Sequence, residues 1–303
     1  MRMLVTGGAG FIGSHLARRL AAEGAQVVVA DDFSSGAWTN LVGFKGDVAT
    51  CDVAADPALL RRLGPFAVIF HEASITDTTV MDQRKMMHNN VEGFRNILDA
   101  ALEWRSRVVW ASSAATYGRL PAPNRESQEP APLNVYGYSK LAMERLAEQV
   151  RPRLAWPIVG LRYFNVYGPG EDHKGRFASM IHQLAKQMLA GRRPRIFIDG
   201  EQKRDFVHID DVVEANLLAA KSRESGVFNV GSGSAATFNR VVLELNRVLH
   251  TSLPPDYIEN PYDFFQTWTE ADLTRSREIL GYNPKVDLAG GIDAYFASGK
   301  LGK

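Results

Sequence analysis

The chain has 303 residues, 45% of them hydrophobic and 23% charged, which excludes a disordered or fibrous protein and allows one sizeable domain with a smaller partner. Lys and Arg total 35 against 34 for Asp and Glu, so no excess charge exists to attract nucleic acid or anionic lipid. The single cysteine, Cys51, cannot form an internal disulfide and fits a reducing compartment. Residues 1–6 lead straight into a glycine turn, and the early apolar runs are too short to span a bilayer; we expect a soluble, cytoplasmic protein.

Short apolar runs alternate with helical patterns through the first half of the chain. Runs typical of strands occupy residues 3–5, 27–30, 67–70, 108–111 and 158–161. Helical periodicity and composition occupy residues 11–23, 57–63, 90–104 and 138–150. Strands separated by helices predict right-handed crossovers and a mainly parallel sheet with helices on both faces. The predicted fold class is therefore α/β, with a doubly wound Rossmann sheet.

Beyond Tyr163 the pattern becomes less regular. A helix is expected over 177–190 and a β-like run over 195–198, followed by an apparent return to the sheet through a strand, a helix and a strand at 207–209, 210–220 and 227–230. Residues 250–303, which contain Pro254, Pro255, Pro261 and Pro284, are interpreted as part of a second, irregular lobe. The two lobes interleave: one comprises 1–165 and 204–249, and the smaller, C-terminal one comprises 166–203 and 250–303.

A glycine-rich turn lies between the first predicted strand and the first predicted helix. Residues 4–13 contain the pattern G-x-G-x-x-G, with glycines at Gly8, Gly10 and Gly13. Glycine permits the tight turn and the close approach of the backbone to a pyrophosphate, which then lies at the positive end of the helix. We predict that this turn binds a dinucleotide through Gly7, Gly10, Phe11, Ile12 and Gly13, which makes the first lobe the dinucleotide-binding domain.

The second predicted strand ends at Asp31, 18 residues after Gly13, where a carboxylate can accept hydrogen bonds from an adenosine ribose. Such a carboxylate repels a 2′-phosphate, and residues 32–38 contain no Lys or Arg to neutralise one, so NAD is favoured over NADP. A glycine turn followed by an N-cap aspartate is the alternative. Further cofactor contacts are predicted from Asp32, Asn90, Asp52 and Val53, although a helix cap explains Asp52 almost equally well.

A serine-rich segment at 111–118 follows another predicted strand, and Tyr136 and Lys140 lie at or just inside a helix start. Their four-residue spacing places Tyr136 and Lys140 on one helix face. A free phenol titrates near pH 10, so a tyrosine base working near pH 7 needs roughly 3 pKa units of help, about 4 kcal/mol. Lys140 and a nicotinamide ring are cations that can supply it, and Ser113 can hydrogen-bond the substrate oxygen from which Tyr136 takes a proton. A pair on a helix surface is the alternative.

Together these motifs resemble the extended short-chain dehydrogenase/reductase family over essentially the whole chain. The resemblance implies that Tyr136 is the principal acid/base, that Lys140 binds the ribose and lowers the pKa of Tyr136, and that Ser113 meets the substrate hydroxyl. Residues 162–169 and 204–212 resemble the family's later motifs.

Those later motifs imply that Asn165 and Arg204 face the diphosphate of a nucleotide sugar, since an arginine fork matches phosphate oxygens. The smaller lobe is then the substrate-binding lobe. A buried ion pair of Arg204 with Asp205 or Asp210 is the alternative.

Within the family, residues 70–73, 111–118, 132–140 and 173–175 resemble the ADP-glyceromanno-heptose 6-epimerases, which act on a heptose of bacterial lipopolysaccharide. The lysine of their His-Lys-Gly string is a second acid/base, so Lys174 is implied to face Tyr136 across the exocyclic carbon; without the resemblance it would be a solvated loop residue. The implied reaction oxidises the C6 carbinol with bound NAD and returns the hydride to the other face. The resemblance also implies that the protein is a homo-oligomer. Where the resembled enzymes often have a lysine suited to NADP, this chain has Trp38.

Three other functions are alternatives to this one. A UDP-hexose 4-epimerase shares the cofactor site and the Tyr136 and Lys140 pair, and is the main alternative. A sugar 4,6-dehydratase needs an Asp-Glu pair where this chain has Ala114 and Ala115. A non-catalytic NAD-binding protein is disfavoured because Ser113, Tyr136 and Lys140 occur together. We therefore predict an isomerase that epimerises a nucleotide-diphosphate sugar, with no metal ligand and neither nucleic acid nor membrane as a partner.

Overall fold

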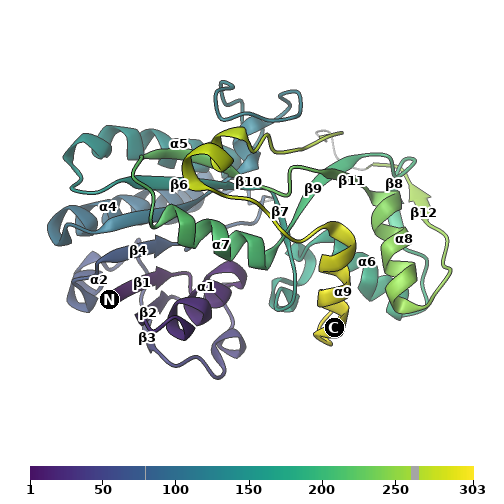
Figure 1. The fold of residues 1–303 in the computed structure, drawn as a ribbon, viewed down its shortest axis with the longest axis horizontal. Helices are drawn as coiled ribbons and strands as arrows, with labels where there is room; N and C mark the ends of the chain where they lie inside the picture. The colour runs from purple at the N-terminus through teal and green to yellow at the C-terminus, as the bar shows by residue number, and fades with distance from the viewer. Residues whose placement is uncertain (79, 261–265) are drawn as a thin grey trace.

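A seven-stranded parallel sheet forms the centre of the computed structural model, which describes residues 1–78, 80–260 and 266–303 (Figure 1). The strand order is β10-β6-β5-β4-β1-β2-β3, and every neighbouring pair is parallel. In chain order the strands are β1 (Arg2–Thr6), β2 (Gln26–Asp31), β3 (Asp47–Thr50), β4 (Val68–His71), β5 (Arg107–Ser113), β6 (Ile158–Tyr163) and β10 (Gly226–Val230). The predicted doubly wound α/β fold is confirmed.

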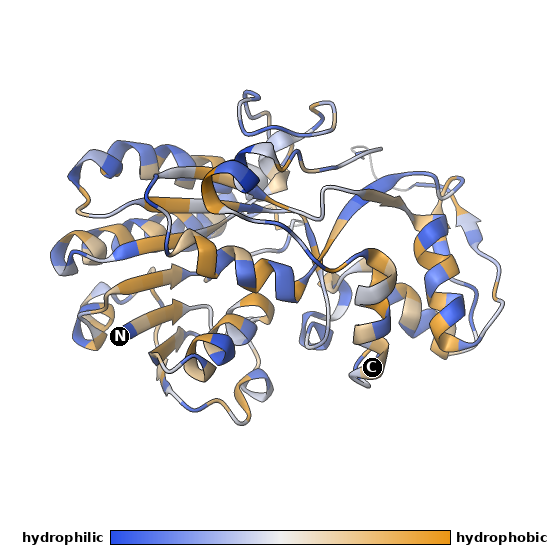
Figure 2. Cartoon of the chain, in the orientation of Figure 1, coloured by the Kyte–Doolittle hydropathy of each residue, from blue (hydrophilic) through white to orange (hydrophobic). Residues whose placement is uncertain are grey.

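Helices cover both faces of this sheet because its strands are apolar on both sides. Val5 and Val29 pack into one core, and their neighbours Leu4 and Val28 pack into another. Consecutive residues of a strand point to opposite faces, so each face needs its own layer of helices. The first core includes side chains of α1 (Phe11–Ala22) and α7 (Ile209–Ala219), and the second includes those of α2 (Pro57–Leu63), α4 (Gly93–Trp104) and α5 (Val135–Val150). Figure 2 shows the strands as largely hydrophobic ribbons between helices of mixed hydropathy.

Several helices begin at residues other than those predicted, and capping side chains fix two of these starts. The helix predicted from residue 138 begins at Val135, because the Asn134 side chain accepts a hydrogen bond of 2.8 Å from the Gly137 N–H. The helix predicted over 177–190 is α6 (Met180–Leu189), capped by Ser179. The helix predicted from residue 90 is preceded by α3 (Gln83–Met87) and a π-helical turn (His88–Glu92). Short 3-10 helices occupy Trp38–Leu41, Ala114–Tyr117, Arg151–Arg153 and Asp172–Phe177.

The smaller lobe has its own core, built mainly from three helices. Side chains of α6, α8 (Phe238–Leu249) and α9 (Leu288–Ala297) form one buried cluster, at the right of Figure 1. Its strands are arranged as β11-β9-β7 and β12-β8. They are β7 (Asn165–Tyr167), β8 (Arg195–Phe197), β9 (Lys203–His208), β11 (Ala235–Thr237) and β12 (Asp256–Ile258).

The segment 250–303 lacks regular secondary structure over most of its described length, as interpreted from the sequence. It nevertheless contains β12, a π-helical turn (Ser276–Leu280) and α9, whereas Pro261 lies outside the described residues. Gly290 and Gly291 lower the intrinsic helix propensity of α9, which is instead capped by the Asp287 side chain and packed against α8. The cap and the packing against α8 therefore outweigh the low intrinsic helix propensity of α9.

The predicted division into two lobes stays a prediction, and the packing suggests where it would be revised. Residues 238–249 were assigned to the dinucleotide-binding domain, but α8 contributes Val241 and Leu245 to the core of the smaller lobe. Conversely, Leu280 and Tyr282 from the end of the chain belong to a core that covers the large sheet.

The carboxyl ends of the parallel strands meet along one edge of the sheet. β1 lies between β2 and β4, so successive strands are added on opposite sides of it, and the crevice outside such a switch point is where doubly wound folds bind ligands. The glycine turn follows β1 at this edge, and Ser113 and Tyr163 end β5 and β6 there. Among the helices in the described ranges, none is both long and apolar enough to cross a membrane.

Candidate active site

The glycine turn between β1 and α1 has almost no room for side chains. Gly7 has φ of +65°, and a Cβ placed there would lie 2.6 Å from the Ala73 nitrogen. A Cβ on Gly13 would overlap the Gly7 carbonyl, whereas one on Gly8 would meet the Val29 side chain. The tight turn therefore depends on Gly7 and Gly13, while Gly8 allows close packing on β2.

The first turn of α1 is suited to an anion. Gly10 is its N-cap and makes no side-chain capping bond, and the turn contains no acidic residue. The N–H groups of a helix's first turn have no partner within the helix and carry a partial positive charge. Phe11, Ile12 and Gly13, all predicted cofactor contacts, lie in this turn.

Asp31, at the end of β2, is fixed against the glycine turn. Its two carboxylate oxygens accept hydrogen bonds of 2.9 Å from the Ala9 N–H and 2.8 Å from the Phe33 N–H. Burial raises the pKa of Asp31, and these two bonds oppose that rise. Asp32 is exposed and accepts two bonds from Ser34 instead. Asp31 thus lies beside the glycine turn, and its contact with a ribose stays a prediction.

The remaining predicted cofactor residues have partners within the protein. Asp52 accepts hydrogen bonds of 2.8 Å and 3.1 Å from the N–H groups of Ala54 and Ala55 in a turn, whereas the cap of the following helix α2 is Asp56 and not Asp52. Val53 is buried in the core beneath α4, which leaves its backbone as the part able to meet an adenine.

Asn90 is also fully buried. It accepts a bond of 2.8 Å from the Ile75 N–H and donates one of 2.9 Å to Ser139 Oγ. The Asn90 amide therefore connects the loop after β4 to α5.

Ser113, Tyr136 and Lys140 meet where β5 ends and α5 begins. The Ser113 hydroxyl acts to lower the pKa of the Tyr136 phenol, and Lys140 Nζ lies 5.8 Å from the centre of the Tyr136 ring. Lys140 is almost fully buried, and its Nζ donates a bond of 2.9 Å to the Ala111 carbonyl. The structure brings these three predicted catalytic residues together.

The electrostatics of this cluster differ from the expectation. Burial raises the pKa of Tyr136, the Ser113 hydrogen bond opposes that rise, and the nearby Glu72 carboxyl adds to it. Burial lowers the pKa of Lys140 to about 8, against the opposing influence of Glu72. Burial, Ser113 and Glu72 together leave the pKa of Tyr136 raised. Lowering this pKa, as expected for a base, therefore requires a cation bound beside the phenol.

Two further residues of this edge, Glu72 and Tyr163, lie outside the predicted catalytic set. Glu72 follows β4, and its Oε1 accepts a bond of 3.0 Å from the Tyr163 hydroxyl. Asn216 of α7 donates a bond of 2.9 Å to the same hydroxyl. Burial raises the pKa of Glu72 to about 7. Their positions directly after and at the end of predicted strands were the available signal.

Lys174 lies on the glycine-turn side of the crevice. Its Nζ is 5.4 Å from the centre of the Phe11 ring, and its N–H donates a bond of 3.0 Å to the Glu171 carbonyl. Burial lowers the pKa of Lys174, against the opposing influence of Glu171. Lys174 is only partly buried, and its described contacts are with Phe11 and Glu171, not with Tyr136.

Asn165 and Arg204 lie on the neighbouring strands β7 and β9. Asn165 Nδ2 donates a bond of 3.2 Å to the Asp205 carbonyl. The Arg204 guanidinium lies 5.9 Å from the centre of the Phe238 ring, and burial lowers its pKa to about 10.

The Asp205 carboxylate, one partner named in the ion-pair alternative for Arg204, has several hydrogen-bond donors around it. It accepts bonds from the N–H groups of Ser232, Gly233 and Ala271. Asp210 lies beside His208, with the His208 Nδ1 to Asp210 Oδ2 distance 3.5 Å.

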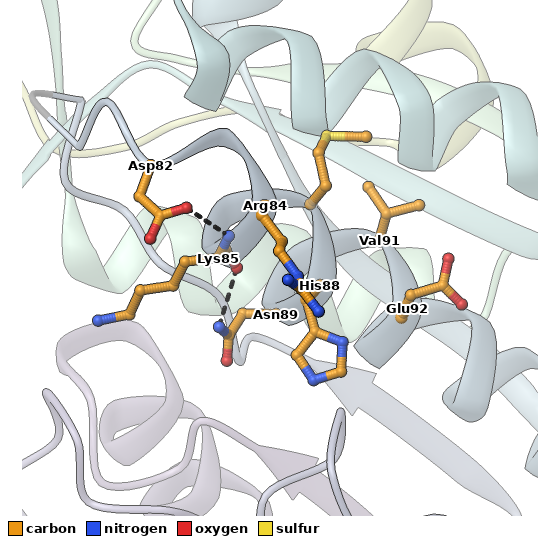
Figure 3. Close-up of a pocket in the computed structure, with 8 residues that line it drawn as sticks. Asp82, Arg84, Lys85, His88, Asn89, Val91 and Glu92 are labelled. Atoms are coloured by element: carbon orange, nitrogen blue, oxygen red, sulfur yellow. Dashed lines mark hydrogen bonds between the residues drawn. The ribbon is translucent and has the colours of Figure 1, made fainter.

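A cavity of about 600 Å³ next to α3 and the π-helical turn contains none of the predicted site residues (Figure 3). Its lining includes Asp82, which accepts a bond of 2.9 Å from the Lys85 N–H, and Asn89, which donates one of 2.9 Å to the Lys85 carbonyl. These bonds cap and continue the local helix. The candidate site therefore lies at the carboxyl edge of the sheet, where the predicted cofactor and catalytic residues are, and not in this cavity.

One family model and three solved structures are among the matches to this chain. Residues 3–231 match the model of the NAD dependent epimerase/dehydratase family. An ADP-L-glycero-D-manno-heptose-6-epimerase from Helicobacter pylori is 40% identical, with a TM-score of 0.93 over 98% of this chain and 95% of its own. A UDP-glucose 4-epimerase from Thermotoga maritima, with UDP-glucose, is 32% identical, with a TM-score of 0.92 over 99% of both chains. A UDP-glucuronic acid 4-epimerase from Bacillus cereus, with UDP-glucuronic acid and NAD, is 29% identical, with a TM-score of 0.86 over 98% of both.

Proposed function

The chain belongs to the NAD dependent epimerase/dehydratase family, and from that premise we propose that it epimerises ADP-glyceromanno-heptose at C6. As a member of this family it is an isomerase that works with bound NAD. The observation that carries the proposal is the meeting of Ser113, Tyr136 and Lys140 beside the glycine turn. The heptose is favoured by the 40% identity to the Helicobacter pylori enzyme and by the string His173-Lys174-Gly175.

The residues at the crevice fit a dinucleotide. A turn too tight for any Cβ at Gly7 and Gly13 leaves space for a pyrophosphate at the start of α1, and Asp31 lies beside that turn. When bound, NAD accepts a hydride from the sugar carbon and returns it, so the reaction has no net redox change. Asp31 and the absence of Lys or Arg from residues 32–38 favour NAD over NADP.

The chain's own residues would supply the proton transfers. The Ser113 hydroxyl orients the substrate hydroxyl toward the Tyr136 phenolic oxygen, which takes its proton as the carbon is oxidised. The same proton, or one from a second group, returns to the oxygen when the carbon is reduced. Lys140, held by the Ala111 carbonyl, keeps a positive charge near the phenolate.

Lys174 is proposed as the second acid/base for the opposite face. The hydroxyl lies on opposite sides in substrate and product, so one group for each side avoids a large reorientation of the sugar. Its lowered pKa and its place over Phe11, in the first turn of α1, support this role. Asn165 and Arg204 are proposed to face the diphosphate of the nucleotide sugar from the smaller lobe.

A UDP-hexose 4-epimerase is the second candidate. The observation in its favour is the 32% identity to the Thermotoga maritima UDP-glucose 4-epimerase over 99% of both chains. In that reaction one tyrosine serves both faces, and Lys174 has no necessary part. A homo-oligomer also stays a prediction, which sedimentation can test.

The experiment that decides between them uses a panel of nucleotide sugars. Purified protein loaded with NAD is incubated separately with ADP-glyceromanno-heptose, UDP-glucose and UDP-glucuronic acid, and stereochemistry is followed by NMR, with Tyr136→Phe as the control. Inversion of the heptose at C6 alone supports the proposal. Inversion at C4 of a UDP-hexose alone would replace it with the second candidate.

A further inference from the structure

A buried carboxyl group lies among the catalytic groups at the ends of three neighbouring strands. Glu72 follows β4, Ser113 ends β5 and Tyr163 ends β6, with β5 between the other two strands. The Glu72 Oε1 to Tyr163 hydroxyl bond of 3.0 Å spans from the end of β4 to the end of β6. His71 pairs with Trp110 in the register of β4 and β5, so Glu72 lies level with Ala111, whose carbonyl Lys140 binds.

Lys140 approaches the same strand end from α5. Its Nζ is bonded to the Ala111 carbonyl of β5, and it interacts electrostatically with Glu72. Glu72 raises the pKa of both Lys140 and Tyr136, while Lys140 lowers that of Glu72. Glu72 is thus the group of this cluster whose charge acts on both of the others.

The other titratable groups around Glu72 keep one charge state near neutral pH. The Tyr163 hydroxyl has its pKa raised well above the usual value, so it stays a neutral hydrogen-bond donor. His71, the last residue of β4, has its pKa lowered to about 3 by burial and by Lys140, and stays neutral. Glu72, Tyr136 and Lys140 remain as the groups of this cluster whose charge can change.

We propose that Glu72 is a positioning residue of this site, whose charge controls how readily Tyr136 and Lys140 release their protons. This inference deepens the proposed function and rests on it, since it assigns Glu72 an effect on the same acid/base. Ionised Glu72 keeps Lys140 protonated and holds the proton on Tyr136; neutral Glu72 releases both constraints. A carboxyl at this place therefore tunes the acid/base without touching the substrate.

Two variants separate the effect of the Glu72 charge from the effect of its hydrogen bond with Tyr163. Glu72→Gln retains an acceptor for the Tyr163 hydroxyl and removes the charge, whereas Tyr163→Phe removes the hydrogen bond and retains the charge. Without the negative charge, both Tyr136 and Lys140 should lose their protons at lower pH, by about one unit each. Tyr163→Phe should leave the Tyr136 titration in place, because Glu72 is already ionised at the pH where Tyr136 titrates.

The test is an NMR titration of tyrosine ring carbons in the NAD-loaded protein, with the Tyr136 signal assigned through Tyr136→Phe. Glu103→Gln, which removes an exposed carboxylate of α4, is the matched control. We expect Tyr136 to titrate about one pH unit lower in Glu72→Gln and at its original pH in Tyr163→Phe and Glu103→Gln. If Glu72→Gln does not fold, Glu72→Met serves as the charge-free variant.

An unshifted or raised titration of Tyr136 in the charge-free variant would overturn the inference, as would equal shifts in that variant and Tyr163→Phe. The NMR titration needs no turnover, so it gives its answer even if the sugar panel finds no substrate. Where a substrate is found, both limbs of the pH profile of kcat/KM should move to lower pH in Glu72→Gln. Epimerisation with an unmoved profile would reject this inference alone and leave the proposed function intact.

Discussion

Lys140 Nζ lies 5.8 Å from the centre of the Tyr136 ring while it donates a hydrogen bond of 2.9 Å to the Ala111 carbonyl. The second turn of α5 is thereby attached to β5, the strand that ends at Ser113. The Ser113 hydroxyl acts to lower the pKa of Tyr136, so both the strand end and the helix contribute to the surroundings of the phenol. A group held in this way can accept a proton without reorganising its surroundings.

Replacement of the Tyr136 hydroxyl should separate catalysis from folding. Tyr136→Phe keeps the ring and its packing, so we expect unchanged unfolding and NAD affinity but a loss of roughly 10²-fold to 10⁴-fold in kcat. Steady-state kinetics, thermal unfolding and calorimetric NAD titration measure the three quantities. Tyr138→Phe, on the same helix with half of its side chain exposed, is the matched control. Near-normal turnover of Tyr136→Phe would remove Tyr136 from its assigned role.

Lys140 should reduce the stability of the fold at neutral pH. Its pKa is lowered to about 8 in the folded protein from the usual 10.5, so the folded state holds the charged form less well than the unfolded state does. This cost is fully present below pH 8 and disappears as the pH rises toward 10.5. We expect Lys140→Met to be inactive but more stable than the natural protein at pH 7, by a margin that narrows above pH 8. Urea unfolding at several pH values measures this, and a less stable variant at pH 7 contradicts it.

NAD should bind more tightly than NADP, because the Asp31 carboxylate repels a 2′-phosphate and residues 32–38 carry no cation. Calorimetric titration with both cofactors measures the difference. Trp38 is 70% exposed and follows Ala37, whose N–H donates a bond of 3.0 Å to the Ala9 carbonyl of the glycine turn. Trp38→Lys should therefore raise NADP affinity by roughly 2-fold to 10-fold, and Trp156→Lys should not. Tighter NADP binding by the natural chain would show that a more distant cation reaches the phosphate.

Lys174 should be required for only one half of the epimerisation. If each face of the sugar has its own acid/base, Lys174→Met loses roughly 10²-fold or more in interconversion but still reduces an aldehyde or ketone analogue with NADH from the Tyr136 side. Arg176→Met, in the same 3-10 segment, is the matched control. Single-turnover assays with NADH and the analogue separate the two steps. Full epimerase activity of Lys174→Met would reject the two-base account and favour the hexose 4-epimerase.

The sequence by itself determined the parts of this protein that are encoded locally. The alternation of apolar runs and helical periods predicted the parallel sheet, because strands buried on both faces must be apolar throughout. The glycine turn was visible because only glycine fits at Gly7 and Gly13. The four-residue spacing of Tyr136 and Lys140 likewise predicted a shared helix face, since the helix period is a local property.

Only the tertiary structure decided where distant segments meet. No local pattern indicates that Lys174 lies over Phe11, that Tyr163 reaches Glu72, or that α8 packs with α9. The pKa values of Tyr136 and Lys140 also depend on this assembly, because burial and the Glu72 charge arise from segments far apart in the chain. Hydrogen-bonding and charge interactions act over a few ångströms in space and not along the sequence, so they are set only once the strand ends are brought together.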